Sequence, residues 1–204
     1  MRLGGLFKNK SFYLGLLILI SGISLTAITS NYVVNNYNPP VLKDFIMDSI
    51  LYFKIAWVYD ILAILSIILI AIYAVTKKPQ ELPYFLVLYG TLYLLRGIFI
   101  LITPLGNPGI NNNPLFVGPT FLAGLYFSGH TAETFLGFLI SKGKYKILFI
   151  TLLVSIIFSL LLARGHYSID ILSGLIFAYA IFCFGEKYLK RHFTIGNNES
   201  KIKL

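Results

Sequence analysis

Long apolar segments dominate the sequence and limit the folds that it can adopt. Six of them contain few charges: roughly residues 12–30, 51–75, 83–103, 120–141, 145–163 and 167–185. Each is close to the length of about 20 residues that a helix needs to cross the hydrocarbon core of a bilayer. Because the connections between them are short, we predict an all-α fold, an integral membrane bundle of six transmembrane helices.

The composition supports a membrane protein over a soluble one. Apolar residues make up 57% of the chain and charged residues only 12%, whereas a soluble domain carries about 25% charged residues. The 17 Lys and Arg exceed the 8 Asp and Glu, which gives a net charge of +9. In a soluble protein this excess would indicate nucleic-acid binding, but in an apolar chain it more often sets membrane orientation. We therefore expect no nucleic-acid partner.

The positions of the cations predict the orientation of the bundle. Cytoplasmic loops are enriched in Lys and Arg, and the six-span scheme places 13 of the 17 cations on one side: Arg2, Lys8, Lys10, Lys77, Lys78, Lys142, Lys144, Lys146, Lys187, Lys190, Arg191, Lys201 and Lys203. Both termini are therefore predicted to be cytoplasmic. An alternative interpretation treats residues 1–30 as a cleaved signal peptide, which would leave the other five segments oriented as before.

The domain organisation is simple. Residues 1–192 are expected to form one membrane domain, and residues 193–204 a short polar tail. Cys183 is the only cysteine, so no internal disulfide can form, and the three histidines lack the spacing of metal ligands. We expect no structural metal, no cofactor and no obligatory protein partner.

Two short segments place histidines on the side opposite most of the cations. One is Ser128-Gly129-His130-Thr131, near the outer end of the fourth span, and the other is Arg164-Gly165-His166-Tyr167-Ser168-Ile169-Asp170, between the fifth and sixth spans. A helix that begins near Tyr167 would bring His166 close enough to Asp170 for the carboxylate to orient the imidazole. Either segment alone is a weak signal, but together on one face they favour an active site.

This arrangement suits phosphoryl transfer. An oriented His166 can attack phosphorus while His130 protonates the departing oxygen. The phosphate oxygens also need cations or N–H groups, and a helix start near His130 would supply some of these. We assign the remaining contacts to three residues of the same segments: Ser128, Gly129 and Arg164.

The two histidine segments resemble motifs of the sphingomyelin synthases, a family within the type 2 phosphatidic acid phosphatase superfamily. That family has Ser-Gly-His-Thr and, later, His-Tyr-Thr-x-Asp, which is similar to residues 166–170 here. Upstream, residues 39–44 (PPVLKD) resemble the family's Pro-Pro-Leu-Pro-Asp with one residue inserted. The family pattern Tyr-Arg-x-x-x-Met-x-Ile-Thr is matched at its Arg, Ile and Thr, which fall on Arg96, Ile102 and Thr103.

The resemblance covers about residues 39–188 and implies a specific mechanism. It implies His166 as the nucleophile that forms a phosphohistidine, Asp170 as its orienting partner, and His130 as acid and then base. Arg96 is the counterpart of the family arginine, and we expect it to bind the substrate phosphate. The resemblance also implies six spans, a site on the extracytoplasmic side, and membrane lipids as substrates.

The sequence departs from the family near the expected site. The acidic residue of the family's Cys-Gly-Asp is missing near Ala123-Gly124-Leu125, and the histidine two positions before the nucleophile is here Arg164. Both changes alter charge beside the phosphate, so the head group stays open, as does the choice between a lipid phosphotransferase and a lipid phosphate phosphatase.

An alternative from a different class is a non-catalytic transporter or membrane scaffold. Ionisable residues inside spans cost free energy and need a partner or a role. Asp60, Arg96 and Glu133 lie in or near predicted spans, where they would line a polar path or form a structural network, and an Asp60–Arg96 bridge is one such use. Release of phosphate or choline from mixed lipids would distinguish an enzyme from a scaffold.

Overall fold

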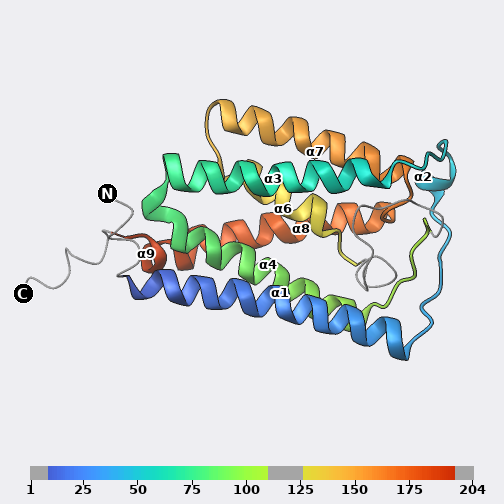
Figure 1. Cartoon of the computed structure of the whole chain (residues 1–204), viewed down its shortest axis with the longest axis horizontal. Coiled ribbons are helices and arrows are strands. Elements are labelled where there is room, and N and C mark those ends of the chain that lie inside the picture. The colour runs from blue at the N-terminus through green and yellow to red at the C-terminus, as the bar shows by residue number, and fades with distance from the viewer. Residues whose placement is uncertain (1–8, 110–125, 196–204) are drawn as a thin grey trace, which may run out of the picture.

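The computed structural model describes residues 9–109 and 126–195, and this part of the chain is built from helices and their connections. Figure 1 shows the long helices lying side by side. In chain order the elements are α1 (Lys10–Asn36), α2 (Phe45–Asp48), α3 (Ala56–Lys77), the 3-10 turn η2 (Pro79–Glu81), α4 (Leu82–Ile102), α6 (Gly129–Ile140), α7 (Lys144–Leu162), α8 (Ser168–Phe184), the π-helical turn η3 (Gly185–Leu189) and α9 (Lys190–Phe193).

Within the described residues, five helical stretches are long and apolar enough to cross a membrane: Lys10–Asn36, Ala56–Lys77, Pro79–Ile102, Lys144–Leu162 and Ser168–Phe193. They overlap five of the six predicted spans, although residues 51–55 of the second span are not helical and precede α3. Large apolar side chains project outward from them, such as Ile68 on α3 and Phe158 on α7. Water would disfavour such surfaces and lipid would not, so the helices indicate a multi-pass membrane protein.

The fourth predicted span, 120–141, does not begin where the helix α6 begins in the structure. α6 covers only Gly129–Ile140, because Ser128 caps its first turn in an extended conformation and accepts a hydrogen bond from the N–H of Thr131. Residues 120–125 of the predicted span lie outside the described residues. The helix that carries His130 therefore begins at Gly129, one residue before the histidine.

The two ends of the bundle differ in charge. The described ends of the chain meet at one of them, where Ser11 Oγ donates to the carbonyl of His192 and the N–H of Ile195 donates to the carbonyl of Gln80. This end contains the cation-rich connections, with ion pairs from Lys78 and Lys190 to Glu81. α2 and the first turns of α3, α6 and α8 lie at the opposite end (Figure 1).

α1 and α4 pack more closely than any other pair of described helices. A Cβ atom on Gly22 would lie 2.4 Å from the carbonyl oxygen of Gly90, and one on Gly90 would lie 2.6 Å from the N of Leu19. Glycines at these positions let the two backbones touch, as small residues do between membrane helices. Beside this contact, Thr26 Oγ1 donates to the carbonyl of Tyr93 at 2.8 Å.

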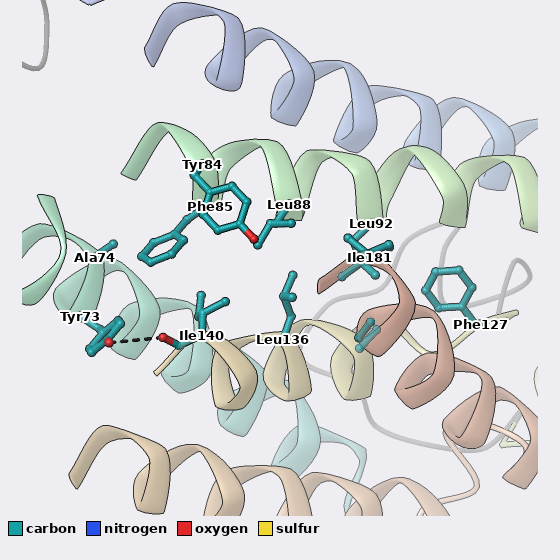
Figure 2. Close-up of a cluster of buried hydrophobic side chains, with 12 residues drawn as sticks. Tyr73, Ala74, Tyr84, Phe85, Leu88, Leu92, Phe127, Leu136, Ile140 and Ile181 are labelled. Atoms are coloured by element: carbon teal, nitrogen blue, oxygen red, sulfur yellow. Dashed lines mark hydrogen bonds between the residues drawn. The ribbon is translucent and has the colours of Figure 1, made fainter. Parts of the chain in front are cut away.

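The largest apolar core lies between α4, α6, α8 and the last turns of α3. Figure 2 shows Tyr84, Phe85 and Leu88 of α4 facing Leu136 and Ile140 of α6. Tyr73 of α3 donates its hydroxyl to the carbonyl of Ile140 at 3.3 Å, which satisfies the polar end of a buried ring. This core fixes α6 against α4 and α8.

A second cluster joins α3, α7 and α8 near the other end. It contains Ala56, Tyr59, Ile156, Leu160, Ala163 and Ile171. The first turn of α3 is thus held beside the connection from α7 to α8, where the second histidine segment lies.

Candidate active site

The connection from α7 to α8 makes a tight turn before His166. Arg164 adopts a positive φ of 52°, a left-handed conformation that costs a residue with a Cβ about 1 kcal/mol. A Cβ on the next residue, Gly165, would lie 2.7 Å from the ring of Tyr59, so only glycine fits. The turn delivers His166 to a buried position, 3% exposed, just before α8.

His166 contacts Asp170 as its spacing predicts. α8 begins at Ser168, and Nδ1 of His166 lies 3.4 Å from Oδ2 of Asp170. The same oxygen accepts the N–H of Tyr167 at 3.1 Å, so the carboxylate both caps α8 and holds the imidazole. Because Asp170 lies beside Nδ1, Nε2 is the ring nitrogen of His166 that is left for a further interaction.

Burial lowers the pKa of His166, and the nearby His130 and Arg96 lower it further, whereas the hydrogen bond and charge of Asp170 act in the opposite direction. The net shift is downward, so the ring is neutral at pH 7 and has a free lone pair. A neutral imidazole is the form that acts as a nucleophile.

His130 lies opposite His166 across the site. The two ring centroids are 5.8 Å apart at an interplanar angle of 66°. The N–H of Ser128 donates to the carbonyl of Asp170 at 3.0 Å, which ties the start of α6 to the start of α8. A Cβ on Gly174 would lie 2.8 Å from the carbonyl oxygen of Ser128, so this approach also depends on a glycine. The structure therefore brings both predicted histidine segments together.

A pocket of about 360 Å³ opens between these groups. Its walls come from α1, α3, α4, α6 and the α7–α8 connection, and the polar residues among them are Thr26, Tyr59, Asp60, Tyr93, Arg96, His130, Glu133 and His166. Gly129 also lines it. Four predicted site residues thus face one cavity: Arg96, Gly129, His130 and His166.

Arg96 is held against the first turn of α6. Its Nε donates to the carbonyl of Phe127 at 3.0 Å, and a Cβ on Gly129 would lie 3.2 Å from the same Nε. Only 8% of Arg96 is exposed. A guanidinium beside a helix N-terminus combines two features that attract a phosphate.

The other predicted residues stand behind or outside the pocket. Asp170 and Ser128 are fully buried behind the histidines, and Ser128 Oγ is 3.1 Å from Thr131 Oγ1. Arg164 turns outward, with Nη2 3.9 Å from Oδ1 of Asp48 and its guanidinium 5.5 Å from the ring of Tyr52. Phosphate binding by Ser128 and Arg164 stays a prediction.

Two further acidic residues approach the site. Oδ1 of Asp60 on α3 lies 3.6 Å from Nε2 of His130, beside the ring of Tyr59, which meets His130 edge-on at a centroid distance of 5.3 Å. Oε2 of Glu133 on α6 accepts the hydroxyl of Tyr93 at 2.6 Å. Their charges inside predicted spans marked them as unusual, but their partners depend on how the helices pack.

Asp44 ties the segment before α2 to the start of α8. Its carboxylate accepts the N–H groups of Ile46 and Met47, and both the N–H and the hydroxyl of Ser168. Nearby, the hydroxyl of Tyr167 donates to the carbonyl of Gly106 at 2.8 Å and accepts the N–H of Leu42 at 2.9 Å. Tyr167 and Ser168, which lie between His166 and Asp170 in the chain, are thereby fixed.

The pKa of Asp44 reflects these contacts. Burial raises it, but the hydrogen bonds from Met47, Ser168 and Ile46 outweigh burial and bring it below the ordinary value. Sequence reasoning found Asp44 only as part of a family resemblance. Its contact with Ser168 spans 124 positions and has no local signal.

Histidine and carboxylate side chains can also bind metals. Within residues 9–109 and 126–195, no group of three or more His, Cys, Asp or Glu side chains is arranged to hold a metal ion. Each of the two site histidines instead lies beside a single carboxylate, His130 beside Asp60 and His166 beside Asp170.

A family model described as "PAP2 superfamily C-terminal" matches residues 124–187, which contain both histidine segments, while Asp44, Asp60 and Arg96 lie upstream of it. No curated protein matches the chain. The family match suggests a phosphatase-type enzyme, and it supports a place for the chain in the PAP2 superfamily.

Proposed function

We propose that the protein is a membrane-embedded lipid phosphatase or lipid phosphotransferase that works through a phosphohistidine on His166. The observation that carries the proposal is the pair of histidines facing each other across one pocket, 5.8 Å between ring centroids, with Asp170 on Nδ1 of His166. The match of residues 124–187 to the PAP2 superfamily supports the same chemistry.

The proposed reaction has two steps. Nε2 of His166 attacks phosphorus, the bond to the lipid oxygen breaks, and His130 gives a proton to that oxygen. An acceptor hydroxyl then attacks the phosphohistidine, gives its proton to His130, and releases His166. Arg96 and the N–H groups at the start of α6 stabilise the phosphate oxygens in both steps.

We further propose the six-span topology with both termini in the cytoplasm. α6, with 12 residues, is about 18 Å long and does not by itself cross about 30 Å of hydrocarbon. It nevertheless packs inside the bundle between α3, α7 and α8, and in this proposal it belongs to the fourth predicted span, 120–141. The cation-rich end then faces the cytoplasm, and the histidines face the extracytoplasmic side.

The substrates in this proposal are membrane lipids. The pocket is lined by residues of α1 and α3, helices whose outer faces are apolar, so a lipid can reach it from the bilayer. A sphingomyelin synthase-like activity would transfer a phospho-head group to a lipid alcohol, whereas a phosphatase would transfer phosphate to water. Both share the same first step.

The test compares wild type with His166→Ala on phosphatidic acid and on phosphatidylcholine in mixed micelles. We expect wild type to cleave at least one of these lipids and to form an acid-labile phosphoenzyme, and His166→Ala to do neither. Ser66→Ala, a buried change on α3 away from the pocket, is the matched control. Full activity in His166→Ala would overturn the mechanism, and a folded wild type without any cleavage would favour the scaffold alternative.

A further inference from the structure

Asp60 stands out among the polar groups of the pocket because the two-histidine mechanism gives it no role. It lies in the second turn of α3, inside a helix long enough to span the membrane, where ionisable side chains are rare and commonly mark functional sites. It lies upstream of the matched segment 124–187. It faces the reacting groups, since it lines the same pocket as both histidines.

The geometry between Asp60 and His130 suits a shared small ligand better than a direct bond. Oδ1 and Nε2 are 3.6 Å apart, beyond the usual length of an N–H···O hydrogen bond. Polar groups at such a separation are commonly joined by a water molecule that bonds to both. Nε2 is the nitrogen on the Asp60 side of the ring, whereas Nδ1 is buried and has no hydrogen-bond partner within the described residues. Proton exchange by His130 therefore takes place beside Asp60.

We propose that Asp60 and His130 together bind and orient the water that attacks the phosphohistidine, so that the phosphoryl acceptor is water. This inference rests on the proposed function and names its acceptor. Water has two hydrogens, and the site offers two acceptors for them: Nε2 of His130, neutral after the first step, and the carboxylate of Asp60. A lipid alcohol has one hydroxyl hydrogen and would leave Asp60 facing a carbon chain.

The second step then balances as follows. The water oxygen forms a bond to phosphorus while the bond from phosphorus to Nε2 of His166 breaks, and that electron pair returns to His166. One water proton passes to Nε2 of His130, which restores its acidic form for the next cycle. The other proton stays on the oxygen, hydrogen-bonded to Asp60, and leaves with the phosphate product. No further reactant is required.

Asp60 is thus distinguished from Asp170 by the step that it serves. Asp170 holds the nucleophile and affects both steps, whereas Asp60 bonds only to the water that enters beside His130 in the second step. Its loss should slow dephosphorylation far more than phosphorylation. It should also let an alcohol compete better with water, because the advantage of the second hydrogen is gone.

The experiment uses the full-length protein in mixed micelles with ³²P-labelled phosphatidic acid and rapid acid-free quenching. Wild type, Asp60→Ala and Asp60→Asn are compared for the rates of phosphohistidine formation and decay. In Asp60→Ala we expect phosphohistidine to form at a rate within about twofold of wild type. We expect it to decay about tenfold more slowly or slower still, because one hydrogen bond to a charged group is lost. Asp60→Asn should lie between them, because its amide oxygen still accepts a hydrogen bond.

A competition experiment supplies the second measurement. With glycerol added, the ratio of glycerol phosphate to inorganic phosphate should rise about tenfold in Asp60→Ala relative to wild type. Ser66→Ala, on the same helix, should match wild type in both measurements. If Asp60→Ala does not fold, Asp60→Asn, which keeps the shape of the side chain, gives the same comparison.

The outcomes separate this inference from the proposed function. Unchanged decay and an unchanged product ratio in the Asp60 variants would overturn the role of Asp60, as would equal slowing of both steps. A wild type that forms no phosphohistidine, or an active His166→Ala, would overturn the proposed function itself. Wild type that transfers phosphate to a lipid alcohol in preference to water would overturn water as the acceptor.

Discussion

Each histidine of the candidate site is paired with a carboxylate, but the two pairs are positioned in different ways. His166 and Asp170 are four residues apart, share the start of α8, and are almost completely buried, with side-chain exposures of 4% and 0%. His130 and Asp60 come from different helices, and 29% of the His130 side chain is exposed to the pocket and its surroundings. The first pair is fixed by local backbone, and the second is set by the packing of α3 against α6.

This difference matches the chemistry proposed for each ring. A nucleophile must keep one geometry through bond formation and cleavage, and the cap of α8 provides it. An acid that later becomes a base must exchange protons with groups that enter and leave, so it needs access to the pocket. Substitutions of His166, His130 and Asp170 test this division, and a substitution of Asp44 tests the contact that holds the start of α8.

The largest effect is expected for His166→Ala. Its comparison with His130→Ala, on substrates with different leaving groups, distinguishes the roles of the two histidines. His166→Ala should lower the cleavage rate by roughly a millionfold on every substrate, because no phosphoenzyme forms. His130→Ala should lower cleavage of phosphatidic acid by about a thousandfold, yet should form phosphohistidine rapidly from 4-nitrophenyl phosphate, whose leaving group needs no proton. The measurement is burst-phase release of nitrophenol. Equal losses in both variants on both substrates would contradict the division of roles.

Asp170→Asn should have the next largest effect. The amide keeps the size of the side chain but removes the charge that orients His166, and a loss of about a thousandfold in kcat is expected. Because Asp170 raises the pKa of His166 while burial lowers it, removal of the charge should lower that pKa further. The acidic limb of kcat/KM, which should lie below pH 6.5 in wild type, should therefore move to lower pH. A limb that moves upward would count against a neutral nucleophile.

Asp44→Asn should have the smallest effect on activity and a visible effect on stability. The carboxylate accepts four hydrogen bonds, and weakening them should cost about 2 kcal/mol. The pKa of Asp44 is lower in the folded protein than in the unfolded chain. Its contribution to the free energy of unfolding is therefore complete at pH values above the ordinary pKa of about 3.9. This contribution is lost as the pH falls toward the pKa of the folded protein. The Tm difference from wild type should be constant from pH 5 to pH 8, by thermal unfolding in detergent, and should narrow below about pH 4. A difference that widens on acidification would exclude this role.

Local features of the site follow from the sequence, and distant ones do not. The spacing of His166 and Asp170 predicts their contact because one helical turn joins them, and the same reasoning places a helix start beside His130. The partner of Asp60 could not be predicted, because it depends on the relative depth of α3 and α6. Arg164 points toward Asp48 because its positive φ turns the chain, which no pattern in the sequence marks.

The same distinction holds for the fold. Length and hydropathy locate five of the long helices. For most of the helix ends, the predicted residue and the observed one differ by no more than two positions. The helix inside 120–141 is shorter than its apolar run, since Ser128 uses its hydroxyl to cap α6 instead of continuing the helix. The contact of Asp44 with Ser168 joins two connections that are both polar and irregular, so periodicity contains no information about it.

The width of the pocket depends on two glycines, Gly22 and Gly90, which have no Cβ atom. Gly22 and Gly90 contribute nothing to the chemistry, but Ile23 and Thr26 of α1 and Tyr93 of α4, which line the pocket, lie within about one turn of them. A methyl group at either glycine would force the two backbones apart and carry that wall of the cavity with them. A mutation in the contact between α1 and α4 should therefore change the shape of the pocket, although neither glycine lines it.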